Sequence, residues 1–165
     1  MRIVRRDHTA TVIATGKGMD RQLLVNGTGI TFLTPITKMM AHLPLASLDR
    51  PPENGLVLCL GMGTSYRSML SWGISTTAVE LVPSIPSLLG FFHPDGDALL
   101  RNPRGTIVVD DGRRFLEQST ATFDMIVVNP PPPVEAAASS LLTPSEFYAA
   151  ARRRLLQPAE SRVFR

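Results

Sequence analysis

The stretch from Leu56 to Leu81, LVLCLGMGTSYRSMLSWGISTTAVEL, limits what this chain can fold into more than any other. It opens on an apolar run that is too short for a buried helix but suits a strand buried on both faces. Gly61 and Gly63 break this run, and a β-rich segment ending at Glu80 follows a helical one. Strand, glycine turn, helix and strand in this order predict half of a parallel nucleoside-binding sheet.

Glu80 and the two glycines carry the functional part of this prediction. Glycine has no Cβ, so the backbone can approach a ligand closely, and a carboxylate at the tip of the next strand can accept hydrogen bonds from ribose hydroxyls. Glu80 follows Gly61 by 19 residues, a spacing typical of dinucleotide-binding units. Many α/β turns contain Gly-x-Gly without a ligand, so a purely structural turn is the alternative.

Residues 1–50 predict a small β-hairpin appendage followed by one helix. Asn26-Gly27 between apolar runs is a strong hairpin signal, because both residues accept positive φ. Thr34 and Pro35 have the residue types of an N-cap and a first helical position. Strands are expected over 11–15, 22–25 and 30–33. The expected buried face of the helix consists of Met39, Met40, Leu43 and Ala46.

Residues 51–165 predict a Rossmann-like nucleoside-binding domain. Apolar runs at 106–109 and 125–128 add two strands to the first pair, and helical segments stand between the strands. This alternation favours an α/β fold with a parallel sheet, right-handed crossovers and helices on both faces. Parallel strands end at one edge, where such sheets bind ligands. The groups expected to converge there are Gly61, Gly63, Glu80, Asp111 and Asn129.

The end of the sequence predicts one more helix and an incomplete sheet. Thr143-Pro144-Ser145-Glu146 has the form of a capping box, and the helix that it opens should reach Leu155. The residues from 161 to 165 suffice only to begin a fifth strand. We therefore expect a sheet truncated at the C-terminus, whose open edge is buried by self-association as a homodimer.

Composition argues against several other classes of protein. The longest apolar stretch, 81–92, holds two prolines, so no membrane span is expected. A net charge of +3 with only 6% aromatic residues argues against a nucleic-acid partner. Cys59 alone cannot form an intramolecular disulfide, which favours a cytoplasmic location. Neither His42 nor His93 has a second ligand type at metal-binding spacing, so no metal is expected.

The ordered set of segments resembles the polyamine aminopropyltransferases, the spermidine synthase family, which share the fold of S-adenosylmethionine methyltransferases. The similarity covers roughly residues 23–155. It implies that Glu80 holds the ribose, and Asp111 with Gly112 the adenine, of decarboxylated S-adenosylmethionine or its product methylthioadenosine. The segments that carry the resemblance are 25–27 (VNG), 41–45 (AHLPL), 58–63 (LCLGMG), 79–81 (VEL), 110–115 (DDGRRF), 123–128 (FDMIVV) and 142–148 (LTPSEFY).

The resemblance fails on the side that would bind the amine. Family members carry one aspartate where this chain has Thr64, and another, which activates the attacking amine, where it has Asn129. The chain also differs from the family at Ile36 and Thr37, where a tyrosine and a glutamine or histidine are expected, and at Pro132, where a second acid is expected. A diamine is a dication that needs opposing carboxylates, and Asn129 cannot accept its proton. Aminopropyl transfer to a diamine is therefore expected to be weak or absent.

Three functions agree with these residues. The chain can be a spermidine synthase-like protein that binds decarboxylated S-adenosylmethionine or methylthioadenosine and has Asn129 at the position of the catalytic acid. It can be an S-adenosylmethionine-dependent methyltransferase, because Asn-Pro-Pro resembles the loop with which amino-methyltransferases grip a planar nitrogen. It can also be a non-catalytic nucleoside-binding or scaffold domain. In the last case Asp110 and Asp111 would only end a strand and cap a helix, and Asn129 would be a turn residue.

Overall fold

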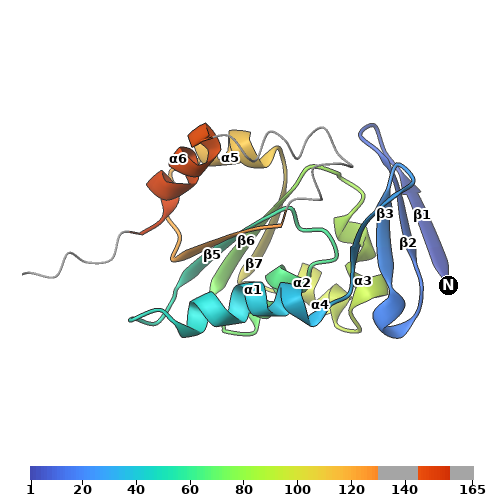
Figure 1. Ribbon diagram of the computed structural model, residues 1–165, viewed down its shortest axis with the longest axis horizontal. Coiled ribbons are helices and arrows are strands. Elements are labelled where there is room, and N and C mark those ends of the chain that lie inside the picture. Colours follow the sequence, from blue (N-terminus) through green and yellow to red (C-terminus); the bar gives the residue numbers. More distant parts are fainter. Residues whose placement is uncertain (130–144, 157–165) are drawn as a thin grey trace, which may run out of the picture.

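Two sheets organise the protein, whose computed structural model describes residues 1–129 and 145–156. A four-stranded antiparallel sheet at the N-terminus stands beside a four-stranded parallel sheet that is layered between helices (Figure 1). This arrangement confirms the predicted fold class.

The antiparallel sheet has the order β1-β2-β3-β4 and is larger than the predicted hairpin. Asn26 and Gly27 have φ values of 52° and 85° and make the expected turn. The first strand was not predicted, because its sequence RIVRR is exposed along almost its whole length and lacks an apolar alternation. The strands are β1 (Arg2–Arg6), β2 (Thr11–Thr15), β3 (Gln22–Val25) and β4 (Thr28–Phe32), with a 3-10 turn at Gly18–Asp20.

The parallel sheet has the order β7-β6-β5-β8, and each neighbouring pair is parallel. Beyond β8, a parallel bridge joins Phe123 to Leu155, so the chain after the last described helix returns alongside this strand. The predicted start of a fifth strand at 161–165 lies outside the described residues. The strands are β5 (Asn54–Leu58), β6 (Ser75–Glu80), β7 (Gly105–Val109) and β8 (Met125–Val128).

Helices cover both faces of this sheet, as predicted (Figure 1). One face carries α1 (Pro35–Ala46), α2 (Thr64–Leu70), a 3-10 turn at Pro86–Leu88, α3 (Leu89–Phe92) and α4 (Gly96–Leu100). The other carries α5 (Gly112–Gln118) and α6 (Ser145–Arg154). Successive side chains of each strand point to opposite faces of the sheet, so the strands contribute to two hydrophobic cores. Val57 packs on the side of α1 and α2, and Leu56 packs on the side of α5 and α6. No helix among residues 1–129 and 145–156 is long and apolar enough to cross a bilayer.

Helix α1 begins as predicted but buries a different face. Thr34 takes the N-cap position and Pro35 starts the helix. The expectation that Met39 and Leu43 are buried is wrong, because their side chains are 44% and 57% exposed. Ala41 and Leu45 are buried instead. Helix α1 packs closely against α2, and a small residue such as Ala41 permits that approach where a methionine would not. Met40 and Ala46 of the predicted face are exposed as well.

Thr64 was expected to be the N-cap of helix α2, but the helix starts one residue earlier. Gly63 occupies the N-cap position with a φ of 79°, and Thr64 is the first helical residue, without a side-chain capping bond. Helix α1 contacts both α2 and β8, so the first helix lies on the parallel sheet. The predicted division of the chain at residues 50 and 51 stays a prediction.

Asp124 anchors the start of the parallel sheet. Its side-chain Oδ2 accepts hydrogen bonds from the backbone N–H groups of Glu53 at 2.6 Å and Asn54 at 2.8 Å. Arg50 forms an ion pair with the same carboxylate. Burial alone would raise the pKa of Asp124, but these hydrogen bonds and the Arg50 charge lower it below its ordinary value of 3.8. One carboxylate therefore joins the linker, β5 and β8.

Candidate functional site

Backbone hydrogen bonds continue past the ends of the four parallel strands and hold their tips side by side. This extension brings the predicted residues to one edge of the sheet, as the parallel topology requires. The three bonds, each 3.0 Å, run from Cys59 N–H to the Val79 carbonyl, from Asp110 N–H to the Glu80 carbonyl, and from Asn129 N–H to the Leu58 carbonyl.

Gly61 and Gly63 have different roles in the loop after β5. Both have positive φ, 54° and 79°, which favours glycine at each position. A Cβ on Gly61 would meet no heavy atom within 4 Å, whereas a Cβ on Gly63 would lie 2.3 Å from Cδ2 of Leu89. Gly61 thus leaves its backbone open to a ligand, and Gly63 allows close packing. Gly112 is less constrained, because a Cβ there would make an ordinary 3.6 Å contact with Leu58.

The Glu80 side chain is buried, with 5% of its surface exposed, and it supports the glycine loop. Its Oε2 accepts a hydrogen bond from Gly61 N–H at 3.1 Å, and its Oε1 accepts one from Val82 N–H at 3.0 Å. Burial raises the pKa of Glu80 above its ordinary value of 4.5, although both N–H groups favour the ionised form. Each carboxylate oxygen can accept a second hydrogen bond, so the group can support the loop and bind hydroxyls together.

Asp110 and Asp111 both have structural partners. Asp111 is the N-cap of α5, and its Oδ1 accepts a hydrogen bond from Arg114 N–H at 2.9 Å. Asp110 accepts one from Arg114 Nε at 2.6 Å and forms an ion pair with that side chain. Asp111 therefore caps α5, whereas its proposed contact with a ligand stays a prediction. Within the described residues Oδ2 of Asp111 makes no hydrogen bond, so capping leaves one oxygen for a ligand.

Cys59 belongs to this edge and was missed as a site residue in the sequence. It directly follows β5 with a φ of 66°, a left-handed conformation that is costly for a residue other than glycine. Burial and the negative charges of Glu80 and Asp111 raise the pKa of its thiol to about 12. The thiol therefore lies within electrostatic reach of both acids and stays protonated. The sequence could have indicated this role, because Cys59 comes immediately after a run of residues expected to form a buried strand.

Asn129 takes part in a hydrogen-bond chain that joins three elements. Its Nδ2 donates to Ser65 Oγ at 2.9 Å, and the Ser65 hydroxyl donates to the Thr37 carbonyl at 3.0 Å. Asn129 is thus more than a turn residue, because it connects β8 with α2 and α1. Ser65 was not a candidate, since nothing in the sequence shows that these helices meet at the β8 tip. Pro132 lies outside the described residues.

His93 holds the glycine loop from the other side. The buried ring places Nε2 2.9 Å from the Met62 carbonyl. Burial and the neighbouring Arg67 charge lower the pKa of His93, with a smaller contribution from Lys38, while the Met62 carbonyl and Asp95 oppose this shift. His93 therefore supports the loop as a neutral imidazole.

The remaining histidine interaction is also internal. His42 accepts a hydrogen bond at its Nδ1 from Trp72 Nε1 at 2.8 Å. No group of three His, Cys, Asp or Glu side chains suited to a metal occurs among residues 1–129 and 145–156.

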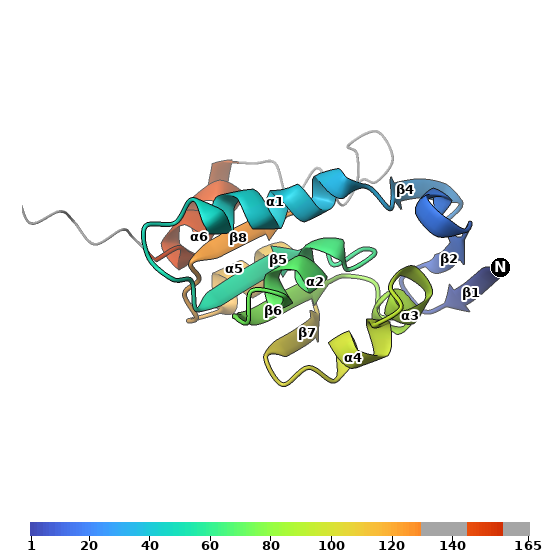
Figure 2. The same cartoon turned by 90° about the horizontal axis from the view of Figure 1, so that it is seen from below.

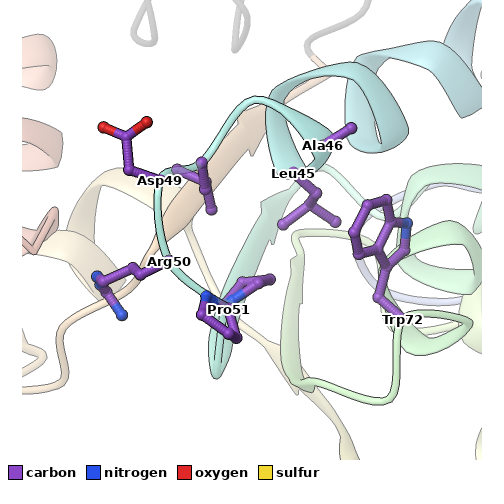
Figure 3. Close-up of a pocket in the computed structure, with 8 residues that line it drawn as sticks. Leu45, Ala46, Asp49, Arg50, Pro51 and Trp72 are labelled. Atoms are coloured by element: carbon purple, nitrogen blue, oxygen red, sulfur yellow. The ribbon is translucent and has the colours of Figure 1, made fainter.

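A surface hollow of about 370 Å³ lies away from this edge (Figure 3). Its walls come from the C-terminal end of α1, the linker before β5, and Trp72 after α2. It is thus at the end of the sheet where the strands begin. None of the predicted site residues lines it, and the Arg50 side chain in its wall pairs with Asp124.

The chain is similar to known transferases in sequence and in structure. It is 30% identical over 131 residues to a polyamine aminopropyltransferase of Klebsiella pneumoniae, covering 74% of this chain and 45% of the relative. It is 31% identical over 98 residues to putrescine N-methyltransferase 2 of Nicotiana tabacum, covering 58% and 28%. A crystal structure of spermidine synthase in complex with the transition state analogue AdoDATO matches with a TM-score of 0.78 at 18% identity, over 93% of this chain and 54% of the other. No family model matches the chain.

The parallel sheet, its glycine loop and the acid at the next strand tip define an α/β protein with the methyltransferase-like fold. Within this class the chain is a spermidine synthase-like protein. It spans about half the length, or less, of the curated relatives that it matches.

A depressed pKa at His93 predicts that the folded protein loses stability in mild acid. Below pH about 6.5 the unfolded chain binds a proton at this residue more readily than the folded one does, so the stabilisation is complete above that pH and decreases below it. Between pH 7.5 and 5.5, the free energy of urea unfolding should decrease more in the unmodified protein than in His93→Gln. An equal decrease in both proteins would contradict this role.

Proposed function

We propose that the chain binds an S-adenosylmethionine-type nucleoside at the carboxyl edge of the parallel sheet. The observation that carries this proposal is Glu80, a buried carboxylate that supports an open glycine loop and retains acceptor capacity for ribose hydroxyls. Oδ2 of Asp111 would accept from the adenine amino group, and Gly61 would let the ligand approach the backbone. Gly63 and Gly112 shape the loop and the start of α5 around the same site.

We also propose that this nucleoside is a co-substrate for alkyl transfer to nitrogen. The lone pair of an acceptor nitrogen attacks the carbon bonded to the sulfonium, so a C–N bond forms and the C–S bond breaks. The electron pair of that bond passes to sulfur, which leaves as a neutral thioether, and the nitrogen then releases one proton to water. Decarboxylated S-adenosylmethionine would donate an aminopropyl group, and S-adenosylmethionine a methyl group.

Similarity supports both versions of this transfer, since the relatives include an aminopropyltransferase and an N-methyltransferase. A nucleoside-binding domain without catalysis is the remaining alternative. A cytoplasmic location, which the lone Cys59 favours, belongs to the same proposal. The partners are then the nucleoside and an amine, with neither a metal nor nucleic acid in the reaction.

Replacing Glu80 by glutamine should weaken nucleoside binding by roughly 10- to 100-fold, because hydrogen bonds to a charged acceptor contribute about 1.5 to 3 kcal/mol each. Calorimetry with S-adenosylmethionine, its decarboxylated form and methylthioadenosine measures this loss. Affinity should also fall as the pH is lowered, starting above the range of an ordinary glutamate, because the pKa of Glu80 is raised.

Asp111→Asn is a second test of the same site, because asparagine caps a helix about as well as aspartate. It should keep the folded structure and lose only the interaction with adenine. Glu80→Ala is less informative, since it leaves two buried N–H groups without acceptors. Unchanged affinity in a folded Glu80→Gln variant would remove the basis of the proposed function.

Putrescine should be a poor acceptor, and Asn129→Asp alone should not make it a good one. Ile36, at a position where the family binds the diamine, is 70% exposed, and the Thr37 hydroxyl donates to the Thr34 carbonyl within the first turn of α1. Neither supplies the negative charge that a dication requires. Product formation from putrescine and decarboxylated S-adenosylmethionine, followed by chromatography, should stay near background in both proteins. Rapid turnover by the unmodified protein would contradict this account.

We propose that the protein forms a homodimer through the β8 side of the molecule. Helix α1 lies along β8 (Figure 2) and presents apolar side chains at helical spacing to solvent. A single helix with such a row can pack against its own copy about a two-fold axis. The row consists of Ile36, Met39, Met40 and Leu43, all more than one third exposed.

Sedimentation at micromolar concentration should therefore show a dimer, and Leu43→Glu should shift it toward the monomer. A charge at this exposed position would be desolvated in the interface without affecting the folded chain. Leu100→Glu is the matched control, because Leu100 is 43% exposed on α4, which contacts β7 at the opposite edge of the sheet. A monomer at all concentrations, or equal effects of both substitutions, would contradict the interface.

A further inference from the structure

We infer that the acceptor side of the site is built for an uncharged nitrogen that donates an N–H, and not for an alkylammonium ion. This inference rests on the proposed function and specifies its second substrate. It follows from the orientation of the Asn129 amide and from the charges around it.

The Asn129 amide is fixed in one orientation by Ser65. The Ser65 hydroxyl has one proton, which it donates to the Thr37 carbonyl, so it can only accept from Asn129 and receives the Nδ2 group. Ser65 is buried at the start of α2, which keeps water from replacing either partner. The amide therefore turns its oxygen away from Ser65.

That oxygen is a buried acceptor without a donor in the described part of the chain. A buried polar atom without a hydrogen bond destabilises the folded protein, so such an atom calls for an explanation. Asn129 lies at the tip of β8, next to the tip of β5 from which the glycine loop begins. An N–H donor bound at this edge beside the nucleoside would remove the cost.

The charges nearby disfavour a cation as that donor. The groups linked to Asn129 are uncharged, and Thr64 beside them is buried and uncharged as well. The charged side chains on the adjoining helices are Lys38 on α1 and Arg67 on α2, and both are positive. Arg67 pairs with Asp95 at 2.9 Å, which leaves Lys38 without an ion pair among the described residues.

The acids of the same edge each have a partner in the fold, and none of them is bonded to Asn129. Glu80 supports the glycine loop, Asp110 pairs with Arg114, and Asp111 caps α5. An alkylammonium ion at Asn129 would therefore lose its hydration, and no carboxylate among residues 1–129 and 145–156 is bonded to the Asn129 amide to oppose its charge, which is costly. A neutral nitrogen, such as that of an arylamine, has no charge to desolvate and can still donate a hydrogen bond to the amide oxygen of Asn129.

The test compares two acceptors of one ring size on the protein saturated with methylthioadenosine. Aniline is uncharged at pH 7.5, and cyclohexylamine is a cation. Calorimetric titration should show that aniline binds at least about tenfold more tightly than cyclohexylamine. A desolvation cost of about 1.4 kcal/mol for the unopposed charge of cyclohexylamine is enough for that ratio. Equal affinities, tighter binding of cyclohexylamine, or no binding of either compound would overturn the inference.

Two substitutions test whether the Asn129 amide causes the preference for aniline. Asn129→Asp should make cyclohexylamine bind more tightly than aniline. The reason is that a carboxylate attracts the cation, whereas the amide oxygen only accepts a hydrogen bond from a neutral donor. Ser65→Ala should reduce the preference for aniline by releasing the amide, whereas Ser71→Ala on the far end of the same helix should leave it unchanged. Methylthioadenosine binding should be retained in all three variants. If the unmodified protein did not bind methylthioadenosine, the proposed function itself would be wrong. Failure of the proposed function can therefore be distinguished from failure of the inference about the acceptor.

Discussion

The hydrogen-bonded ladder between the parallel strands fixes where the groups of the candidate site lie. It extends one residue beyond β5, β7 and β8, so that the groups after these strands stand in a row with the end of β6. Neighbouring strands are about 4.8 Å apart, so such a row spans a length comparable to a nucleoside. Asp124 secures the other end of the ladder by joining the first residue of β5 to the start of β8. A shift in either pairing would separate Glu80 from the glycine loop.

The ladder explains why much of the fold could be predicted from the sequence. Buried parallel strands appear as short apolar runs, and the group that follows each run must lie at the shared edge. This reasoning located Glu80, Asp111 and Asn129 correctly at that edge without any knowledge of side-chain contacts. The Asn26-Gly27 turn was equally predictable, because few residue pairs accept two positive φ values.

Features that depend on which faces meet were not predictable. Helix α1 has two apolar rows, and the sequence favours the one with larger side chains, whereas packing against α2 selects the row with Ala41. Ser65 looks like any polar residue near a helix start until the β8 tip is placed beside it. The double role of Asp111, which caps α5 and keeps one free oxygen, also requires coordinates, because either role alone has the same sequence pattern.

An asparagine at the β8 tip need not mean a failed enzyme. A general base is required when the attacking nitrogen carries an extra proton, as an alkylamine does at neutral pH. A neutral nitrogen already has its lone pair available, and after attack it becomes cationic and acidic enough to lose its proton to water. Under those conditions the useful group at Asn129 is one that orients an N–H without adding charge. The same physical chemistry that disfavours a dication beside an uncharged amide would therefore make a carboxylate unnecessary for a neutral acceptor.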